Sequence, residues 1–184
     1  MLSVIKLGGS LLETETLPDC LRTIQRRAGR IAMVTGGGLF AEQVRLQQER
    51  WQFDERAAHR MALLSMQQMA LLCQSFLPEA SLFYSVADFA KVKGIGIWMP
   101  QIDELDAHQI PASWEVTSDS LAAWLAGRLN ADMLNVVKAA PVERHADLTT
   151  LQTQGLLDDA FLRFAEPKNY AINVLSQQDF VSAP

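Results

Sequence analysis

The chain opens on Ser3-Val4-Ile5-Lys6-Leu7-Gly8-Gly9-Ser10, an apolar run with one lysine that ends in two glycines. Such a short run, rich in branched apolar residues, is typical of a buried β-strand. Glycines lack a Cβ and readily take φ > 0, so their N–H groups can turn together toward an anion, and Lys6 adds a positive charge nearby. The stretch predicts a strand whose carboxyl end binds an anion, with phosphate as the candidate.

A second cluster repeats this pattern: the apolar run 31–35 is followed by Gly36, Gly37 and Gly38, and a helical pattern over 39–51 begins directly behind them. A helix N-terminus favours negative charge, so the cluster predicts a second anion site. Two simpler interpretations stay open, namely that the glycines form tight turns and that Lys6 is an edge-strand lysine. Neither cluster fits the P-loop or the dinucleotide fingerprint.

Between the two clusters lies a helix signal that begins at Thr16, with Pro18 in the first turn, and ends near Gly29. Residues 3–35 therefore predict a strand–helix–strand unit of a parallel sheet, with both glycine turns at the same edge. Further along, we expect helix 54–77, with Met61, Leu72 and Phe76 on a buried face that Ala58, Ala62, Leu64 and Met69 widen. We also expect strand 82–84, helix 85–93, strand 97–99, irregular turns over 102–108, helix 156–165 and strand 171–175.

The third informative stretch is Trp114-Glu115-Val116-Thr117-Ser118-Asp119-Ser120. Thr117 or Ser118 can cap a helix over 119–129, where Asp119 by default only complements the helix dipole. A buried strand over 133–137 then ends in Lys138, which places a second lysine at a strand terminus.

Composition narrows the function further. The 184 residues predict one domain, and a net charge of −5 with a pI near 5.2 gives no basic field for nucleic acid. Cys20 and Cys73 are isolated, so we expect reduced cytosol, no disulfide framework and no metal site built from side chains. No secretory signal is visible, and the most apolar segment, 61–77, is too polar and short to span a membrane.

In order, Lys6-Leu7-Gly8-Gly9-Ser10, Val34-Thr35-Gly36-Gly37-Gly38 and Thr117-Ser118-Asp119-Ser120-Leu121-Ala122-Ala123 resemble the amino acid kinase superfamily, which includes acetylglutamate, aspartate, uridylate, carbamate and isopentenyl phosphate kinases. The resemblance runs from residue 1 to about 138. It implies an α/β/α sandwich around a mostly parallel sheet and transfer of the ATP γ-phosphoryl group to a small acceptor. It also implies one domain over 1–184, shortened in the half that usually holds adenine and ribose.

The resemblance also implies roles for single residues. Lys6 would contact the transferring phosphoryl group and Asp119 would orient the lysine, while Mg²⁺ would be held chiefly by phosphate oxygens. The remaining candidates fall on two sides: Gly8, Gly9, Ser10, Ser118 and Lys138 on the ATP side, and Gly36, Gly37, Gly38 and His59 on the acceptor side. This distribution agrees with phosphoryl transfer, which mainly needs positioning and charge neutralisation.

One subgroup looks closest. The segments 57–63 and 66–68, together with Val137-Lys138, resemble the small kinase that phosphorylates an aminomethyl-furan methyl phosphate in methanofuran-type coenzyme biosynthesis. In that case His59, Arg56 or Arg60 would face the acceptor phosphate. One departure stands out, because Lys138-Ala139 occupies the place of the Thr-Asp pair of many relatives.

Three hypotheses follow: an ATP-dependent small-molecule kinase, a binding module of the same fold without catalysis, and a kinase of a carboxylate or nucleotide acceptor. Helix 54–77 can pack within one subunit or across a dimer, so a homo-oligomer is possible.

Overall fold

Six strands form one sheet, in the order β3-β4-β2-β1-β5-β6, and every pair is parallel. A computed structural model describes residues 1–12, 14–143, 146–166 and 170–182. The strands span β1 Leu2–Leu7, β2 Arg30–Thr35, β3 Ser81–Phe83, β4 Ile95–Trp98, β5 Met133–Lys138 and β6 Ala171–Ser176.

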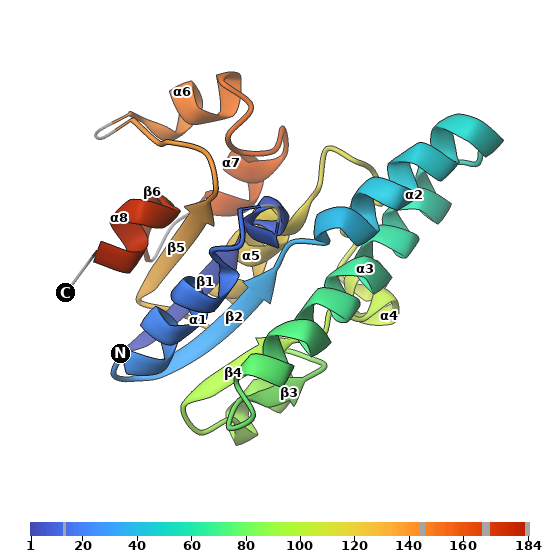
Figure 1. The fold of residues 1–184 in the computed structure, drawn as a ribbon. Coiled ribbons are helices and arrows are strands. Elements are labelled where there is room, and N and C mark those ends of the chain that lie inside the picture. Colours follow the sequence, from blue (N-terminus) through green and yellow to red (C-terminus); the bar gives the residue numbers. More distant parts are fainter. Residues whose placement is uncertain (13, 144–145, 167–169, 183–184) are drawn as a thin grey trace.

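Helices cover both faces of this sheet (Figure 1). On one face the core is built with α1, part of α3, and α8; on the other it is built with α5 and α7. The α-helices span α1 Leu17–Arg26, α2 Gly38–Trp51, α3 Glu55–Phe76, α4 Ile102–Ala107, α5 Ser118–Arg128, α6 Leu148–Thr153, α7 Phe161–Ala165 and α8 Gln177–Ser182. The predicted α/β/α sandwich with a parallel sheet is therefore confirmed.

The crossover between β1 and β2 positions the site. Leu7 pairs with Thr35 at the carboxyl ends of the two strands, so the glycine stretches that follow them leave the sheet at the same edge. Helix α1 makes this crossover, and Pro18 lies in its first turn as predicted, but the helix ends at Arg26 with Arg27 as its C-cap, so Gly29 lies beyond the expected position. Thr16 makes no capping hydrogen bond to the helix; its hydroxyl instead bonds to Gln177.

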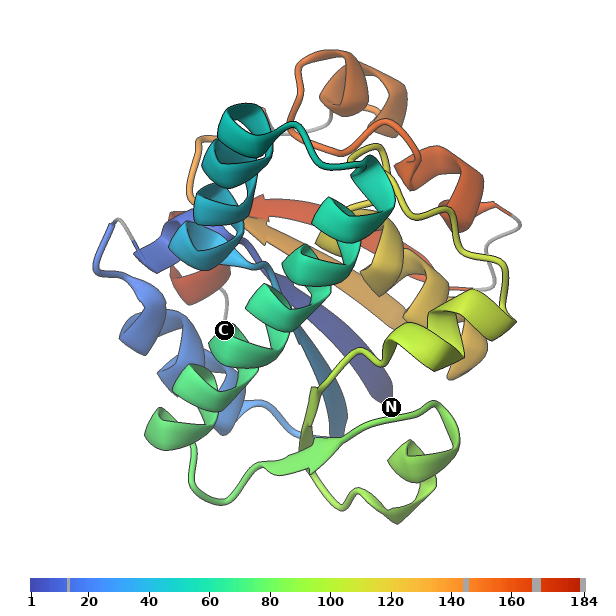
Figure 2. The same cartoon turned by 90° about the vertical axis from the view of Figure 1, so that its right-hand side faces the viewer.

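Helices α2 and α3 pack against each other, and α3 also crosses one face of the sheet, where it contacts β2 and β4 (Figure 2). The predicted buried face of α3 was partly wrong: Met61, Leu64 and Phe76 are exposed, whereas Ala58 and Met69 are buried as expected. The buried side of α3 instead carries two polar residues, His59 and Ser65, beside Ala58, Leu63, Met66, Met69, Ala70 and Cys73. Hydrophobicity alone did not separate the buried side from the exposed side because apolar side chains surround this helix.

The remaining differences lie in short elements. A 3-10 helix at Ala87–Lys91 replaces the helix expected over 85–93, and the turns expected over 102–108 form α4. The helix expected over 156–165 is only the five-residue α7, while α6 precedes it and is capped by Asp147, which accepts a hydrogen bond from Thr150 N. Strand 171–175 is confirmed as β6, and α8 after it was not predicted.

Candidate active site

The two glycine turns touch each other. A Cβ added to Gly36 would stand 2.6 Å from the nitrogen of Gly9, and one added to Gly9 would stand 2.3 Å from the nitrogen of Gly38. The turns are also tied to the sheet, since Gly8 N donates to the Val137 carbonyl at 2.9 Å and Gly36 N donates to the Leu7 carbonyl at 2.8 Å. Only glycine allows this approach of two backbones.

The third stretch meets the same point, because Ser118 Oγ lies 3.4 Å from where a Cβ on Gly36 would stand. Ser118 begins α5, and Asp119 follows in its first turn. All three stretches that carry the resemblance to the kinases therefore converge at the carboxyl edge of β1, β2 and β5.

Two lysines meet at Asp119. Lys6 pairs with Val136 across β1 and β5, so Lys138, two residues further along β5, projects from the same face of the sheet. Lys6 Nζ lies 2.8 Å from Asp119 Oδ1, and Lys138 Nζ donates to Oδ2 at 2.6 Å. Lys6 is 4% exposed and Asp119 is 3% exposed, so the interaction is almost entirely shielded from water.

This arrangement fixes the charge of the centre. Burial raises the pKa of Asp119, but the ammonium groups of Lys6 and Lys138 outweigh burial and hold that pKa below its usual value. Burial, reinforced by the positive charge of Lys6, lowers the pKa of Lys138 to about 8, although Asp119 acts in the opposite direction. Two ammonium groups around one carboxylate leave a net positive charge, which suits a site for an oxyanion.

A residue that sequence reasoning missed holds the start of α5. Asp158 Oδ2 accepts hydrogen bonds from Thr117 N at 2.9 Å, from Thr117 Oγ1 at 2.7 Å and from Ser120 N at 3.0 Å, and Ser120 Oγ donates to Oδ1. Asp158 thus caps α5 from a distant part of the chain, and Thr117 does not cap the helix with its own side chain. Asp119 lies between the two residues that Asp158 binds.

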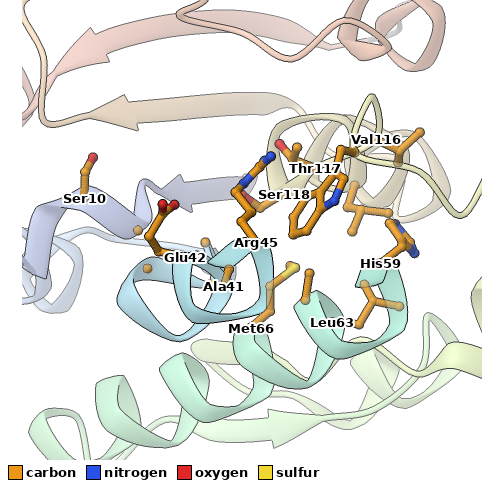
Figure 3. Close-up of a pocket in the computed structure, with 17 residues that line it drawn as sticks. Ser10, Ala41, Glu42, Arg45, His59, Leu63, Met66, Val116, Thr117 and Ser118 are labelled. Carbon is orange, nitrogen blue, oxygen red and sulfur yellow. The ribbon is translucent and has the colours of Figure 1, made fainter. Parts of the chain in front are cut away.

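A pocket of about 290 Å³ opens beside the glycine turns (Figure 3). Residues from both turns line it, together with His59 and Ser118. Its lining thus includes residues that we assigned to opposite sides, namely Gly9, Ser10, Gly36, Gly37, Gly38, His59 and Ser118. Lys6, Gly8 and Lys138 are not part of this lining.

His59 is buried, at 4% exposed, and not at the surface where an isolated histidine usually lies. Burial lowers its pKa, although the Val116 backbone and the Asp106 carboxylate act against this effect, so the ring is mostly neutral at pH 7. Its Nε2 has no hydrogen-bond partner among the residues that the structure describes. A buried nitrogen without a partner costs stability, which makes His59 a candidate for contact with a bound molecule. The arginines beside it, Arg56 and Arg60, both contact Asp106.

A second cavity, of about 860 Å³, lies in the C-terminal half. It is bordered by the segment after β5, by α6 and α7, and by β6, which is the edge strand of the sheet. Of the residues that the structure describes, no lysine or arginine lines it, whereas Glu143, Asp147, Glu166 and Asp179 do.

Across residues 1–12, 14–143, 146–166 and 170–182, no three histidine, cysteine, aspartate or glutamate side chains gather in a way that could hold a metal ion. Over the same ranges, no helix has both the length and the apolar character needed to cross a membrane.

Comparisons with known proteins agree with this geometry. The fold is shared with uridylate kinase from Archaeoglobus fulgidus, with a TM-score of 0.74 and 17% identity over 98% of this chain and 94% of that one. It is also shared with UMP kinase from Bacillus anthracis (TM-score 0.69, 16% identity, 96% and 87% of the two chains) and with aspartate kinase from Synechocystis (TM-score 0.72, 16% identity, 97% and 38%).

The search of the curated proteins found no match. At sequence level, the model of the amino acid kinase family matches residues 1–141, which include both glycine turns and the Lys6–Asp119–Lys138 centre. The chain therefore belongs to the amino acid kinase family, whose members are phosphotransferases.

Proposed function

We propose that this protein transfers the γ-phosphoryl group of ATP to a small anionic acceptor. The observation that carries the proposal is the buried Lys6–Asp119–Lys138 centre, which stands where the two glycine turns touch. Phosphoryl transfer spreads negative charge over the oxygens of the transferring group, and fixed positive charges in a dry site stabilise that charge. Lys6 and Lys138 would supply these charges, and Asp119 would hold both lysines in place.

On the donor side, Gly8, Gly9, Ser10 and Ser118 would bind the ATP phosphates together with Lys138. The nucleoside would lie in the cavity beside β6, whose volume of about 860 Å³ supports this assignment. The carboxylates of Glu143 and Glu166 would accept hydrogen bonds from ribose hydroxyls and an adenine amine, whereas the phosphates would stay near the lysines. Mg²⁺ would be held mainly by phosphate oxygens, and when bound it would neutralise part of the triphosphate charge.

On the acceptor side, Gly36, Gly37, Gly38 and His59 would bind the acceptor, for which we propose a phosphate monoester. A small body is favoured, because the pocket measures about 290 Å³. The aminomethyl-furan methyl phosphate of methanofuran-type coenzyme biosynthesis is the candidate that the resemblance suggests. The proteins of similar fold act on both kinds of acceptor, since uridylate carries a phosphate and aspartate carries carboxylates.

The deciding experiment is an assay of ADP release with Mg-ATP and a panel of phosphate monoesters, nucleoside monophosphates and amino-acid carboxylates. Lys6→Ala should lower kcat by about 10²- to 10³-fold, because it removes one contact to the developing charge. The matched control is Lys93→Ala, since Lys93 is an exposed lysine that is not part of the Lys6–Asp119–Lys138 centre. Equal turnover by Lys6→Ala and wild type would exclude this role for Lys6.

The same assay separates the alternatives. Turnover with carboxylates alone would place the chain among the carboxylate kinases of the family. If Mg-ATP produced no heat in calorimetry and no thermal shift, the chain would be a binding module that kept the fold without the chemistry.

We further propose that the protein self-associates through α2 and α3. Leu64 and Leu71 lie two turns apart on the same side of α3 and are about half exposed, as is Leu46 on α2, where Trp51 is 66% exposed. Exposed apolar side chains in such number are typical of an interface. Light scattering of wild type and of Leu64→Glu would show whether a larger assembly forms and whether this face holds it.

A further inference from the structure

One wall of the acceptor pocket is an arginine stacked on a tryptophan. Arg45 comes from α2 and Trp114 from the segment before α5, yet Arg45 Cζ lies only 3.7 Å from the centre of the Trp114 ring. Both residues line the pocket, and Figure 3 shows the Arg45 side chain extending from α2 toward Thr117 and Ser118. The stacking therefore brings two distant parts of the chain together beside the glycine turns.

The tryptophan is itself held in place. Trp114 Nε1 donates to Gln48 Oε1 at 2.7 Å, and Gln48 Nε2 donates to the Phe53 carbonyl at 3.2 Å. Gln48 lies one turn after Arg45 on the same helix. The indole is thus fixed by one hydrogen bond and one stacking contact to α2, so the guanidinium rests on a fixed surface.

The charge of Arg45 is not neutralised by a carboxylate. Among the described residues, Arg22, Arg56 and Arg60 form ion pairs, whereas Arg45 forms none. Glu42 lines the same pocket one turn earlier, and these two side chains make no ion pair with each other. Stacking uses the flat face of a guanidinium and leaves the N–H groups at its edge free to bind an oxyanion at two points.

The other residues that line the pocket show what else a bound molecule would contact. Apolar side chains, among them Leu63, Met66 and Leu121, line the pocket together with the polar glycine turns. A molecule in this pocket therefore has an apolar surface for its body, backbone N–H groups from the glycine turns, and one unpaired guanidinium.

We propose that Arg45 binds the anionic group of the acceptor and that Trp114 is a positioning residue that holds the guanidinium for this contact. The inference rests on the proposed function and deepens it, because it assigns the residue that binds the phosphate of the acceptor and gives the acceptor an apolar body. Glu42 sets a limit on that body, since a further anionic group close to this carboxylate would be repelled.

The test compares Arg45→Ala with Arg50→Ala. Arg50 is a matched control, because it lies on the same helix and also stacks on a tryptophan, Trp51, at 5.0 Å, but does not line the pocket. Arg45→Ala should raise the KM for the acceptor by about ten- to a hundredfold, as expected for loss of a charge-assisted hydrogen bond, with the KM for ATP unchanged. Arg50→Ala should leave both values unchanged.

Trp114 is tested by a pair of variants. Trp114→Phe keeps an aromatic face for the guanidinium and should stay close to wild type in acceptor KM, whereas Trp114→Ala should approach Arg45→Ala. If Trp114→Ala and Trp114→Phe gave the same acceptor KM, the positioning role would be refuted. A rise in the KM for ATP instead of the acceptor in Arg45→Ala would refute the assignment of Arg45.

Calorimetry with inorganic phosphate and no ATP separates this inference from the proposed function. Binding by wild type and Arg50→Ala but not by Arg45→Ala supports the anion site even if no acceptor in the panel is phosphorylated. Equal binding by all three proteins would overturn the site even if the protein proves to be a kinase.

Discussion

Gly9 and Gly38 approach so closely that a Cβ on Gly9 would stand 2.5 Å from the Cα of Gly38. Backbone faces backbone here, so no side-chain rotation can make room. The contact joins the turn after β1 to the start of α2, and through them the two sides of the proposed phosphoryl transfer. The site thus requires that residue 9 carry no side chain, not even a methyl group.

We therefore expect Gly9→Ala to destabilise the protein by about 1–3 kcal/mol, the usual cost of overpacking, and to abolish phosphoryl transfer by separating the turns. Gly127→Ala is the control, because nothing lies within 4 Å of a Cβ at that position in α5. It should be neutral or stabilising by up to about 1 kcal/mol. Urea unfolding and the ADP-release assay measure both effects, and a fully active Gly9→Ala would contradict the prediction.

The carboxylate of Asp119 is expected to matter for stability as well as for activity. Asp119→Asn leaves the buried ammonium group of Lys6 and the partly buried one of Lys138 without a counter-charge, which should cost about 3–5 kcal/mol in the free energy of unfolding at neutral pH. Because the pKa of Asp119 is lower in the folded state than its usual value of 3.8, the stabilisation from its negative charge is present above about pH 3.8 and is lost as the pH falls below that value. The difference between the two proteins should narrow in acid. Asp88→Asn, which breaks an exposed ion pair with Lys91, should change little.

Lys138 is expected to set the alkaline limit of activity. With its pKa lowered to about 8, the free enzyme loses this positive charge above that pH, and kcat/KM should fall accordingly. Lys138→Arg should move the fall to higher pH, because a guanidinium stays charged. A profile without any decline between pH 7 and 9.5 would exclude a role for charged Lys138.

Whereas kcat/KM should fall at alkaline pH, the contribution of Lys138 to the free energy of unfolding should rise. The unfolded chain keeps the Lys138 proton up to the ordinary value of 10.5, so between about pH 8 and 10.5 the unfolded state binds more protons than the folded state. The contribution of Lys138 to the free energy of unfolding should therefore rise with pH across this window. Chemical unfolding of wild type and Lys138→Met at pH 7.5 and 10 measures this contribution.

Asp158 is expected to act as a positioning residue. Asp158→Ala removes the acceptor of four hydrogen bonds at the start of α5, which should destabilise the protein by about 1–3 kcal/mol and displace Asp119. We expect kcat to fall more than the KM for either substrate, with Asp158→Asn intermediate. Asp159→Asn is the control, since the backbone carbonyl of Asp159 accepts a hydrogen bond from Gln152, while its carboxylate makes none with the described residues. A merely structural role would lower stability without changing kcat at low temperature.

His59 is expected to reduce stability in exchange for acceptor binding. Its Nε2 is buried without a partner, so His59→Leu should raise the free energy of unfolding or leave it unchanged. If the ring contacts the acceptor, the same variant should raise the acceptor KM. Loss of stability without any change in KM would show that His59 serves only the fold.

The sequence predicts structural features that depend on neighbouring residues better than features that depend on residues far apart in the chain. The glycine turns, the crossover through α1 and the lysines at the ends of β1 and β5 are local patterns, and all were found. Asp158 gave no signal, because its partners Thr117 and Ser120 lie about forty positions away and nothing around it suggests a helix cap. The buried face of α3 was missed for a related reason, since the sheet and α2 decide which side of it is covered.

The hydrogen bonds from Thr117 and Ser120 to Asp158 also bear on when the site can form while the chain is being translated. Both lysines and Asp119 have been translated by residue 138, but the side chain that fixes the start of α5 comes twenty residues later. While the ribosome still shields the segment that carries Asp158, the nascent chain holds both lysines and Asp119 without the residue that fixes the start of α5. We therefore expect the Lys6–Asp119–Lys138 centre to take its final arrangement only after Asp158 has left the ribosome.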